Sequence, residues 1–215
     1  MSKQKRLFER ATESQLGALE EVRRTLRQAE VNARAISESE QFSDSYKSAE
    51  VEALSQSTRA VAARALREAQ EAQESLETEL QKSFAVEAPA EERTYNAARI
   101  GTALGNVRNV EELVELYGSE PIRRDAALRS ELERAVELHP LGKHALWQET
   151  LRQARPEAVK AAEQWRGKLS AFTGLTGKIT EEAVGSGFRQ EKHAELEPIL
   201  ASFANERGKL LSRVE

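Results

Sequence analysis

The sequence predicts an all-α protein, in which a long antiparallel helical hairpin, coiled-coil-like, is followed by a compact multi-helix C-terminal domain. Aromatic residues make up only 5% of the chain and charged residues 32%, while the apolar residues are mostly Ala, Leu and Val, a composition that favours helices. Residues 43–84 contain no Gly or Pro, and their apolar side chains recur at helical spacing. Nowhere does the chain show the period-two pattern of a strand bounded by turn residues.

The first predicted helix runs from about Lys3 to Ile36. Its inward positions alternate at spacings of four and three residues, the a/d rhythm of a coiled-coil seam. They are Phe8, Thr12, Gln15, Leu19, Val22, Leu26, Ala29, Ala33 and Ile36. Residues 37–45 are polar and rich in Ser, so we expect the hairpin turn there, with Ser43 or Asp44 capping the second helix.

The second predicted helix, residues 43–84, carries a stripe whose spacing averages close to an eleven-residue repeat, which keeps it on one face. Val61, Ala65 and Ala72 widen this stripe into a small-residue face that admits another helix. Because the first helix can occupy only one side, we expect these three to stay uncovered and to contact another chain. The predicted protein-interaction residues are Val51, Leu54, Val61, Ala65, Ala72 and Leu76.

Pro89 cannot continue the second helix and is well placed near the start of a new one. We therefore predict a hairpin at residues 1–84, a linker at 85–92 and a helical domain at 93–215. Shorter helices are expected in that domain, at about residues 90–107, 110–118, 120–139, 141–154, 156–172 and 188–214. Residues 173–187 hold four of the eleven glycines and are predicted to be its loosest loop.

The segment TGLTGKIT, residues 173–180, is similar to a phosphate-binding loop in Gly174, Gly177 and Lys178. That loop needs four residues between its glycines and a Ser or Thr directly after the Lys. Here two residues separate the glycines and Ile179 follows the lysine. The sequence therefore favours a helix end and an ordinary loop.

The three histidines, His139, His144 and His193, do not form a metal motif. His139 and His144 are five residues apart across a Pro-Gly turn, whereas stacking two imidazoles on one helical face requires a spacing of four. We expect His139 near a helix C-terminus, where the dipole favours an imidazolium. Adjacent carboxylates are expected in the first turn of a helix, where the positive end of the helix dipole stabilises negative charge. The pairs are Glu91–Glu92, Glu111–Glu112 and Glu181–Glu182.

Ala97, Gly101 and Gly105 fall four residues apart on one helical face. Such a ladder lets two helix backbones approach closely. We predict a tight contact inside the C-terminal domain, with a contact between subunits as the alternative.

The composition limits the partners that the chain can have. The absence of cysteine excludes disulfides, thiolate zinc sites and a cysteine nucleophile, and suits a reducing compartment. The net charge of −4 is spread evenly along the chain, so a nucleic-acid partner is not expected. No apolar run approaches the roughly 18 residues of a membrane span, and no export signal is seen. The expected location is the cytoplasm, or a particle assembled there.

Taken together, these patterns favour a non-enzymatic structural or assembly protein that packs through its hairpin into a homo-oligomer or a larger complex, such as a virion or a cellular scaffold. The alternative is a helical adaptor or regulator that binds one protein partner. An enzyme with a site in residues 95–215, built from His139, His144 and Glu residues, ranks third. A long hairpin offers contact area but no convergent polar pocket, so no catalytic residue, cofactor, metal or small-molecule ligand is predicted.

Overall fold

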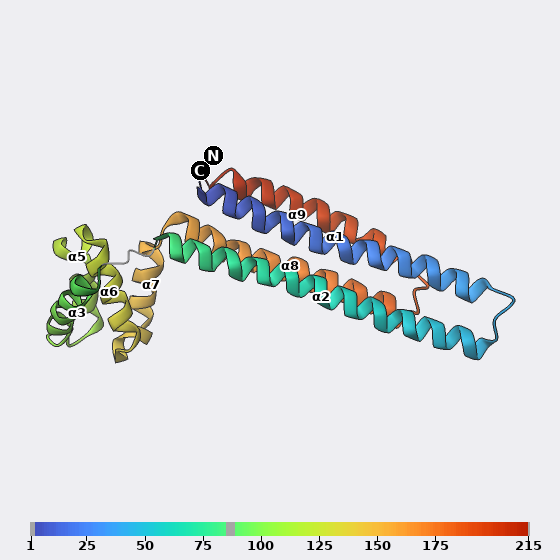
Figure 1. The fold of residues 1–215 in the computed structure, drawn as a ribbon, viewed down its shortest axis with the longest axis horizontal. Coiled ribbons are helices and arrows are strands. Elements are labelled where there is room, and N and C mark those ends of the chain that lie inside the picture. Colours follow the sequence, from blue (N-terminus) through green and yellow to red (C-terminus); the bar gives the residue numbers. More distant parts are fainter. Residues whose placement is uncertain (1–2, 85–88, 215) are drawn as a thin grey trace. The chain divides into compact units, whose positions relative to one another are not determined.

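The computed structural model describes residues 3–84 and 89–214, and within these residues it contains helices, turns and loops but no strand. It confirms the predicted fold class, a helical hairpin together with a multi-helix domain (Figure 1). The chain divides into two compact units: unit 1 comprises Met1–Leu80 and Glu157–Glu215, and unit 2 comprises Gln81–Pro156. Residues 85–88 of the predicted linker lie outside the described residues.

The hairpin consists of α1 (Lys3–Glu38) and α2 (Asp44–Phe84). Its predicted seam is correct along most of its length: from Phe8 to Ala33 every predicted seam position of α1 is buried, and Ile36 is half-buried. The facing residues of α2 are small or apolar apart from one glutamine; those that are buried are Ser55, Thr58, Ala62, Ala65, Ala69, Gln73, Leu76 and Leu80. As expected, Ser43 caps α2, because its hydroxyl accepts the backbone N–H of Tyr46 at 3.3 Å.

Two further helices, α8 (Glu157–Gly185) and α9 (Leu196–Leu211), pack on this hairpin and complete a four-helix bundle in unit 1 (Figure 1). The short 3-10 helix η2 (Lys192–Glu195) precedes α9. α9 runs antiparallel to α1: Arg207 Nε donates to Thr12 Oγ1 at 2.9 Å, and Arg23 pairs with Glu197 at 3.3 Å. The helices therefore alternate in direction in the order α1, α2, α8, α9.

α8 runs antiparallel to α2. Gln73 Nε2 donates to the Ala162 carbonyl at 2.9 Å, and Arg59 pairs with Glu181 at 3.1 Å. This arrangement differs from the prediction that residues 93–215 form one domain, because residues 157–214 belong with the hairpin. An amphipathic pattern reveals that a helix has a buried face but does not specify which groove receives it.

A buried polar chain crosses the middle of the bundle. Trp165 Nε1 donates to Gln15 Oε1 at 2.7 Å, and Gln15 Nε2 donates to Gln73 Oε1 at 3.2 Å. The Gln73 amide in turn donates to Glu77 Oε1 at 2.7 Å. Gln15 and Gln73 are 0% and 2% exposed, so each unpaired amide would carry the full cost of desolvation. These hydrogen bonds therefore fix the registers of α1, α2 and α8 relative to one another.

The prediction of a loop at residues 173–187 is wrong, because α8 continues without a break to Gly185. Thr173, Thr176, Ile179, Thr180 and Ala183 form a buried helical face across this stretch. Packing of that face offsets the roughly 1 kcal/mol that each interior glycine costs relative to Ala. The helix ends later, at a Schellman turn in which Phe188 N donates to the Ala183 carbonyl at 2.8 Å and Gly187 has a φ of 63°.

Unit 2 is a small helical domain. Its elements are α3 (Ala90–Leu104), α4 (Val110–Gly118), α5 (Glu120–Arg124), α6 (Ala126–Glu137), η1 (Pro140–Lys143) and α7 (Ala145–Ala154). The predicted cap at Asn109 is correct, since its side chain accepts Glu112 N at 2.9 Å. The single helix expected at 120–139 is instead broken at Asp125, whose carboxylate caps α6 by accepting Ala127 N at 2.9 Å.

The core of unit 2 lies between its helices and includes Trp147, whose ring meets that of Tyr117 edge-on at 5.2 Å. The Tyr117 hydroxyl donates to Glu133 Oε1 at 2.6 Å. Burial and this hydrogen bond raise the pKa of Tyr117 above its ordinary value. Trp165, which the sequence placed in the same domain, belongs instead to the core of unit 1.

The topology predicts that unit 1 folds without unit 2. Gln73 contacts Ala162, so the chain leaves α2 and re-enters α8 at the same end of the bundle. Replacing residues 81–156 with a Gly/Ser linker of about six residues, a common length between bundled helices, should leave a highly helical protein with one cooperative thermal transition by circular dichroism. A non-cooperative melt would contradict the division into units.

Candidate functional site

The six predicted interaction residues lie along α2 in two environments. Ala65 and Leu76 are buried, each 3% exposed, whereas Val51, Leu54, Val61 and Ala72 are half-buried. Leu54 and, further along, Ala72 with Leu76 line two shallow grooves between α1 and α2. The structure therefore leaves part of the predicted stripe accessible at the edge of the hairpin.

The expectation that Ala65 stays uncovered is wrong. α8 packs against this part of α2: a Cβ added at Gly177 would lie 3.6 Å from Leu66 Cδ1, and Arg166 Nε donates to Glu77 Oε1 at 2.7 Å. The small side chains of α2 thus admit a helix of the same chain. Their spacing alone predicted that a helix would pack there but did not specify its origin.

Two of the three histidines act as caps. His139 Nδ1 accepts Leu141 N at the start of η1, and His144 Nδ1 accepts Leu146 N at the start of α7, both at 3.3 Å. His139 lies just after the end of α6, near a helix C-terminus as predicted, and its side chain also caps the start of η1.

The third histidine forms a part-buried acid–base pair in unit 1. Glu30 on α1 is 5% exposed and accepts His193 N at 3.1 Å, and its other oxygen contacts His193 Nδ1. The sequence did not predict this pair because the two residues are 163 positions apart. With Nδ1 engaged, the Nε2 atom of His193 remains for other partners.

A polar cleft of about 630 Å³, here called the arginine cleft, adjoins this pair. It lies where α1 faces η2 and the first turn of α9. Its lining contains no apolar side chain and consists of Gly17, Glu20, Glu21, Arg23, Arg24, Arg27, His193 and Glu197. Three guanidinium groups and three carboxylates share this lining, so the cleft offers hydrogen-bond donors to an oxyanion and acceptors to hydroxyl groups.

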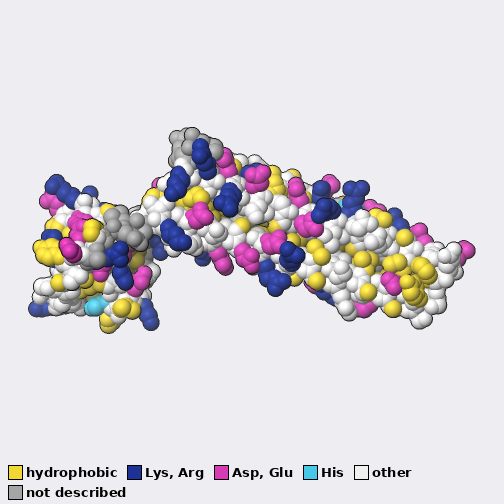
Figure 2. Space-filling view, in the orientation of Figure 1, with side chains coloured by type: hydrophobic (Ala, Val, Ile, Leu, Met, Phe, Trp, Pro, Cys, Tyr) yellow, Lys and Arg dark blue, Asp and Glu magenta, His cyan; other side chains and the backbone are white. Residues whose placement is uncertain are grey.

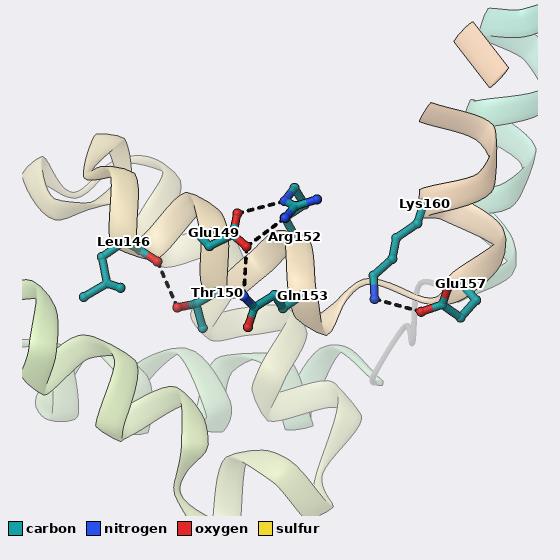
Figure 3. Close-up of polar contacts among 7 residues, drawn as sticks. All are labelled: Leu146, Glu149, Thr150, Arg152, Gln153, Glu157 and Lys160. Atoms are coloured by element: carbon teal, nitrogen blue, oxygen red, sulfur yellow. Dashed lines mark hydrogen bonds and ion pairs between the residues drawn. The ribbon is translucent and has the colours of Figure 1, made fainter. Parts of the chain in front are cut away.

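Carboxylates elsewhere are held in surface ion pairs. In α7, Arg152 and Gln153 donate to Glu149, and Thr150 donates to the Leu146 carbonyl at 2.9 Å (Figure 3). The hydrogen bonds from Arg152 and then Gln153 lower the pKa of Glu149 to about 2. An exposed carboxylate that stays ionised in this way is unsuited to general acid catalysis at neutral pH.

Two further predictions about side-chain positions need correction. Glu181 and Glu182 lie inside α8, not in the first turn of a helix, and Glu181 pairs with Arg59 across the bundle. The small-residue ladder Ala97, Gly101 and Gly105 is exposed on α3, and a Cβ at Gly101 would meet nothing within 4 Å. The ladder therefore makes no tight contact inside unit 2.

The exposed apolar side chains of unit 1 concentrate at the hairpin tip, defined as residues 31–50. Val31, Phe42 and Tyr46 are 57%, 40% and 46% exposed, and the rings of Phe42 and Tyr46 touch with centroids 4.7 Å apart. Figure 1 shows α1 and α2 continuing past the ends of α8 and α9 to reach this turn. Hydrophobic side chains also gather near this end in the space-filling view (Figure 2).

Comparison of the chain with protein-family models, with curated proteins and with solved structures gave no match. Among the described helices, none combines the length and apolar character that crossing a membrane requires. Within residues 3–84 and 89–214, no group of three or more His, Asp and Glu side chains is placed to hold a metal ion. The candidate sites therefore rest on the geometry of the hairpin tip and of the arginine cleft.

Ala65→Glu should unfold or strongly destabilise unit 1, because it buries an unpaired carboxylate between α2 and α8. We expect a loss of about 3 kcal/mol or more in the free energy of unfolding. Ala63→Glu is the matched control, because Ala63 lies two residues away on α2 and is exposed. This variant should change the free energy of unfolding little. Urea titration followed by circular dichroism measures both; equal stabilities would contradict the burial of Ala65.

Glu206 should make the stability of unit 1 sensitive to acid. Lys168 and Lys209 donate to this carboxylate and lower its pKa to about 2, from an ordinary value of 4.5. Because the folded pKa is the lower one, the stabilisation is complete above about pH 4.5 and is lost as the pH falls towards 2.

The measurement compares thermal melts of wild type and Glu206→Gln between neutral and acid pH. The variant should melt below wild type at neutral pH, and the difference should disappear near pH 2. Glu71→Gln, an exposed carboxylate on α2, serves as the control. A difference between wild type and Glu206→Gln that is independent of pH would contradict the ion pairs.

Proposed function

We propose that the protein is a non-enzymatic assembly protein whose hairpin tip binds other protein chains, in a homo-oligomer or a larger complex. The observation that supports this is the clustering of exposed apolar side chains. Of the four large ones that the described part of unit 1 exposes, three lie within residues 31–46, and the fourth is Leu175 on α8. Single exposed apolar residues are ordinary, but a cluster on a projecting element is typical of a binding surface.

The chemistry of the tip suits a protein partner. Aromatic side chains bury large areas at low cost in side-chain entropy and are enriched at the centres of protein interfaces. Tyr46 also offers a polar end: its hydroxyl is hydrogen-bonded to Glu50, which raises the pKa of Tyr46. Phe42 and Tyr46 already touch, so less freedom is lost when a partner covers them.

The interface that the sequence predicts along α2 excludes Ala65 and Leu76, because both side chains are buried within unit 1. Val51 and Leu54 remain half-buried on the tip side of α2 and could extend the contact. The alternative function is a helical adaptor that uses the same tip for one partner of a different kind. Self-association of the purified protein distinguishes the homo-oligomer from the adaptor, because an adaptor for a different partner does not need to bind itself.

Phe42→Ser with Tyr46→Ser should abolish self-association and leave the helical content unchanged, because both side chains are exposed. Sedimentation velocity over a wide concentration range, together with circular dichroism, measures both properties. Leu175→Ser is the matched control, since it removes an equally exposed apolar side chain from α8. A wild-type chain that stays monomeric, or a double variant that associates as wild type does, contradicts the homo-oligomer.

A further inference from the structure

The arginine cleft has the size and the polarity of a small-molecule site. Its volume of about 630 Å³ lies within the usual range of roughly 300–1,000 Å³ for ligand pockets. All its lining residues are charged or polar apart from Gly17. An apolar ligand body would find no apolar side chain to cover, so the expected ligand is polar.

Three guanidinium groups on α1 line the cleft and are available to a ligand. Arg23 and Arg24 take part only in exposed ion pairs, with Glu197 and Glu21. Such pairs contribute little in water and are readily exchanged for another anion. Arg27 is exposed, and no hydrogen bond or ion pair of it is found among the described residues. Glu20, Glu21 and Glu197 balance the three positive charges, so an anion that binds here competes with these carboxylates for the guanidinium N–H groups.

His193 contributes a ring nitrogen of fixed orientation to the arginine cleft. The buried carboxylate of Glu30 receives both the backbone N–H and Nδ1 of His193, which fixes the orientation of the ring. Glu30 is thus a positioning residue, and the second ring nitrogen of His193 is the one left for a ligand in the cleft that this side chain lines. A histidine and several arginines around one polar cleft are a typical binding arrangement for a phosphoryl group.

Gly17 keeps part of the cleft open. A glycine inside a helix is unfavourable, yet a Cβ at Gly17 would meet nothing within 4 Å, so packing does not demand it. Its backbone is an ordinary part of α1. Because Gly17 lines the cleft and an added Cβ has open space around it, a larger side chain here would extend into the cleft.

We propose that the arginine cleft binds a phosphorylated polyol, such as a sugar phosphate. The phosphoryl group lies with Arg23, Arg27 and His193, and the hydroxyl groups donate hydrogen bonds to the carboxylates of Glu20, Glu21 and Glu197. The carboxylates favour a polyol phosphate over a bare anion, because only the polyol has hydroxyl groups that donate hydrogen bonds to them. No Phe, Tyr or Trp side chain lines the cleft to stack on a base, which disfavours a nucleotide.

The test is isothermal titration calorimetry of the full-length protein with glucose 6-phosphate, glucose, inorganic phosphate and AMP. Glucose 6-phosphate should bind more tightly than the other three. Arg23→Ala with Arg27→Ala should weaken its binding roughly tenfold or more. Arg67→Ala, which removes an exposed arginine of α2 outside the cleft, should leave binding unchanged.

A second variant blocks the cleft without changing its charge. Gly17→Leu should abolish binding of glucose 6-phosphate while the protein stays folded, because leucine favours the helix and has free space at this position. Circular dichroism checks the fold of each variant. Phe42→Ser with Tyr46→Ser should bind the sugar phosphate as wild type does, which separates this site from the hairpin tip.

Three results would overturn the assignment. One is binding of none of the four probes by the wild type. Another is equal binding by wild type and by the Arg23/Arg27 double variant or the Gly17→Leu variant. The third is binding of inorganic phosphate or AMP at least as tight as that of glucose 6-phosphate, which would exclude recognition of the polyol.

Discussion

The bundle of unit 1 depends on the hydrogen-bonded chain of Trp165, Gln15 and Gln73, which ties α1, α2 and α8 to one another. Apolar layers alone tolerate sliding by a turn, because Ala, Leu and Val side chains fit several registers. A buried amide tolerates none, since a shift leaves its donors and acceptors unpaired. The many alanines around this chain allow close packing, and the two glutamines decide which of the close packings is adopted.

The sequence was sufficient to predict the secondary structure but not the assignment of helices to units. The hairpin could be predicted because the seam from Phe8 to Ala33 and the caps at Ser43 and Asn109 are local signals. The fate of residues 157–214 was not predictable, because the choice between the hairpin and a separate domain depends on contacts between distant residues. The loop predicted at the glycines of α8 is wrong for a related reason. The local preference of glycine for loops is outweighed by burial of the helix face around them.

The candidate sites also depend on contacts between distant residues, which the sequence alone does not reveal. Ala65 was correctly predicted to lie where a helix packs, but that helix is α8 of the same chain. Ala72 is half-buried beside a groove between α1 and α2. The arginine cleft was not predicted at all: its arginines on α1 look in sequence like the solvated face of a coiled coil. Only the approach of His193, held by Glu30, distinguishes that part of the face from the rest. A pairing over 163 positions leaves no local pattern from which it could be found.

The insertion of unit 2 between α2 and α8 has a consequence for how the chain folds. During synthesis the hairpin emerges first, and the face of α2 that carries Ala65 and Leu76 has no cover until residues 157–185 follow. If unit 2 is still disordered, closing the bundle requires a long loop, whose entropic cost grows with its length. Once unit 2 has folded, it replaces that long loop with a compact body. Early folding of the inserted unit therefore shortens the search of α8 for its groove.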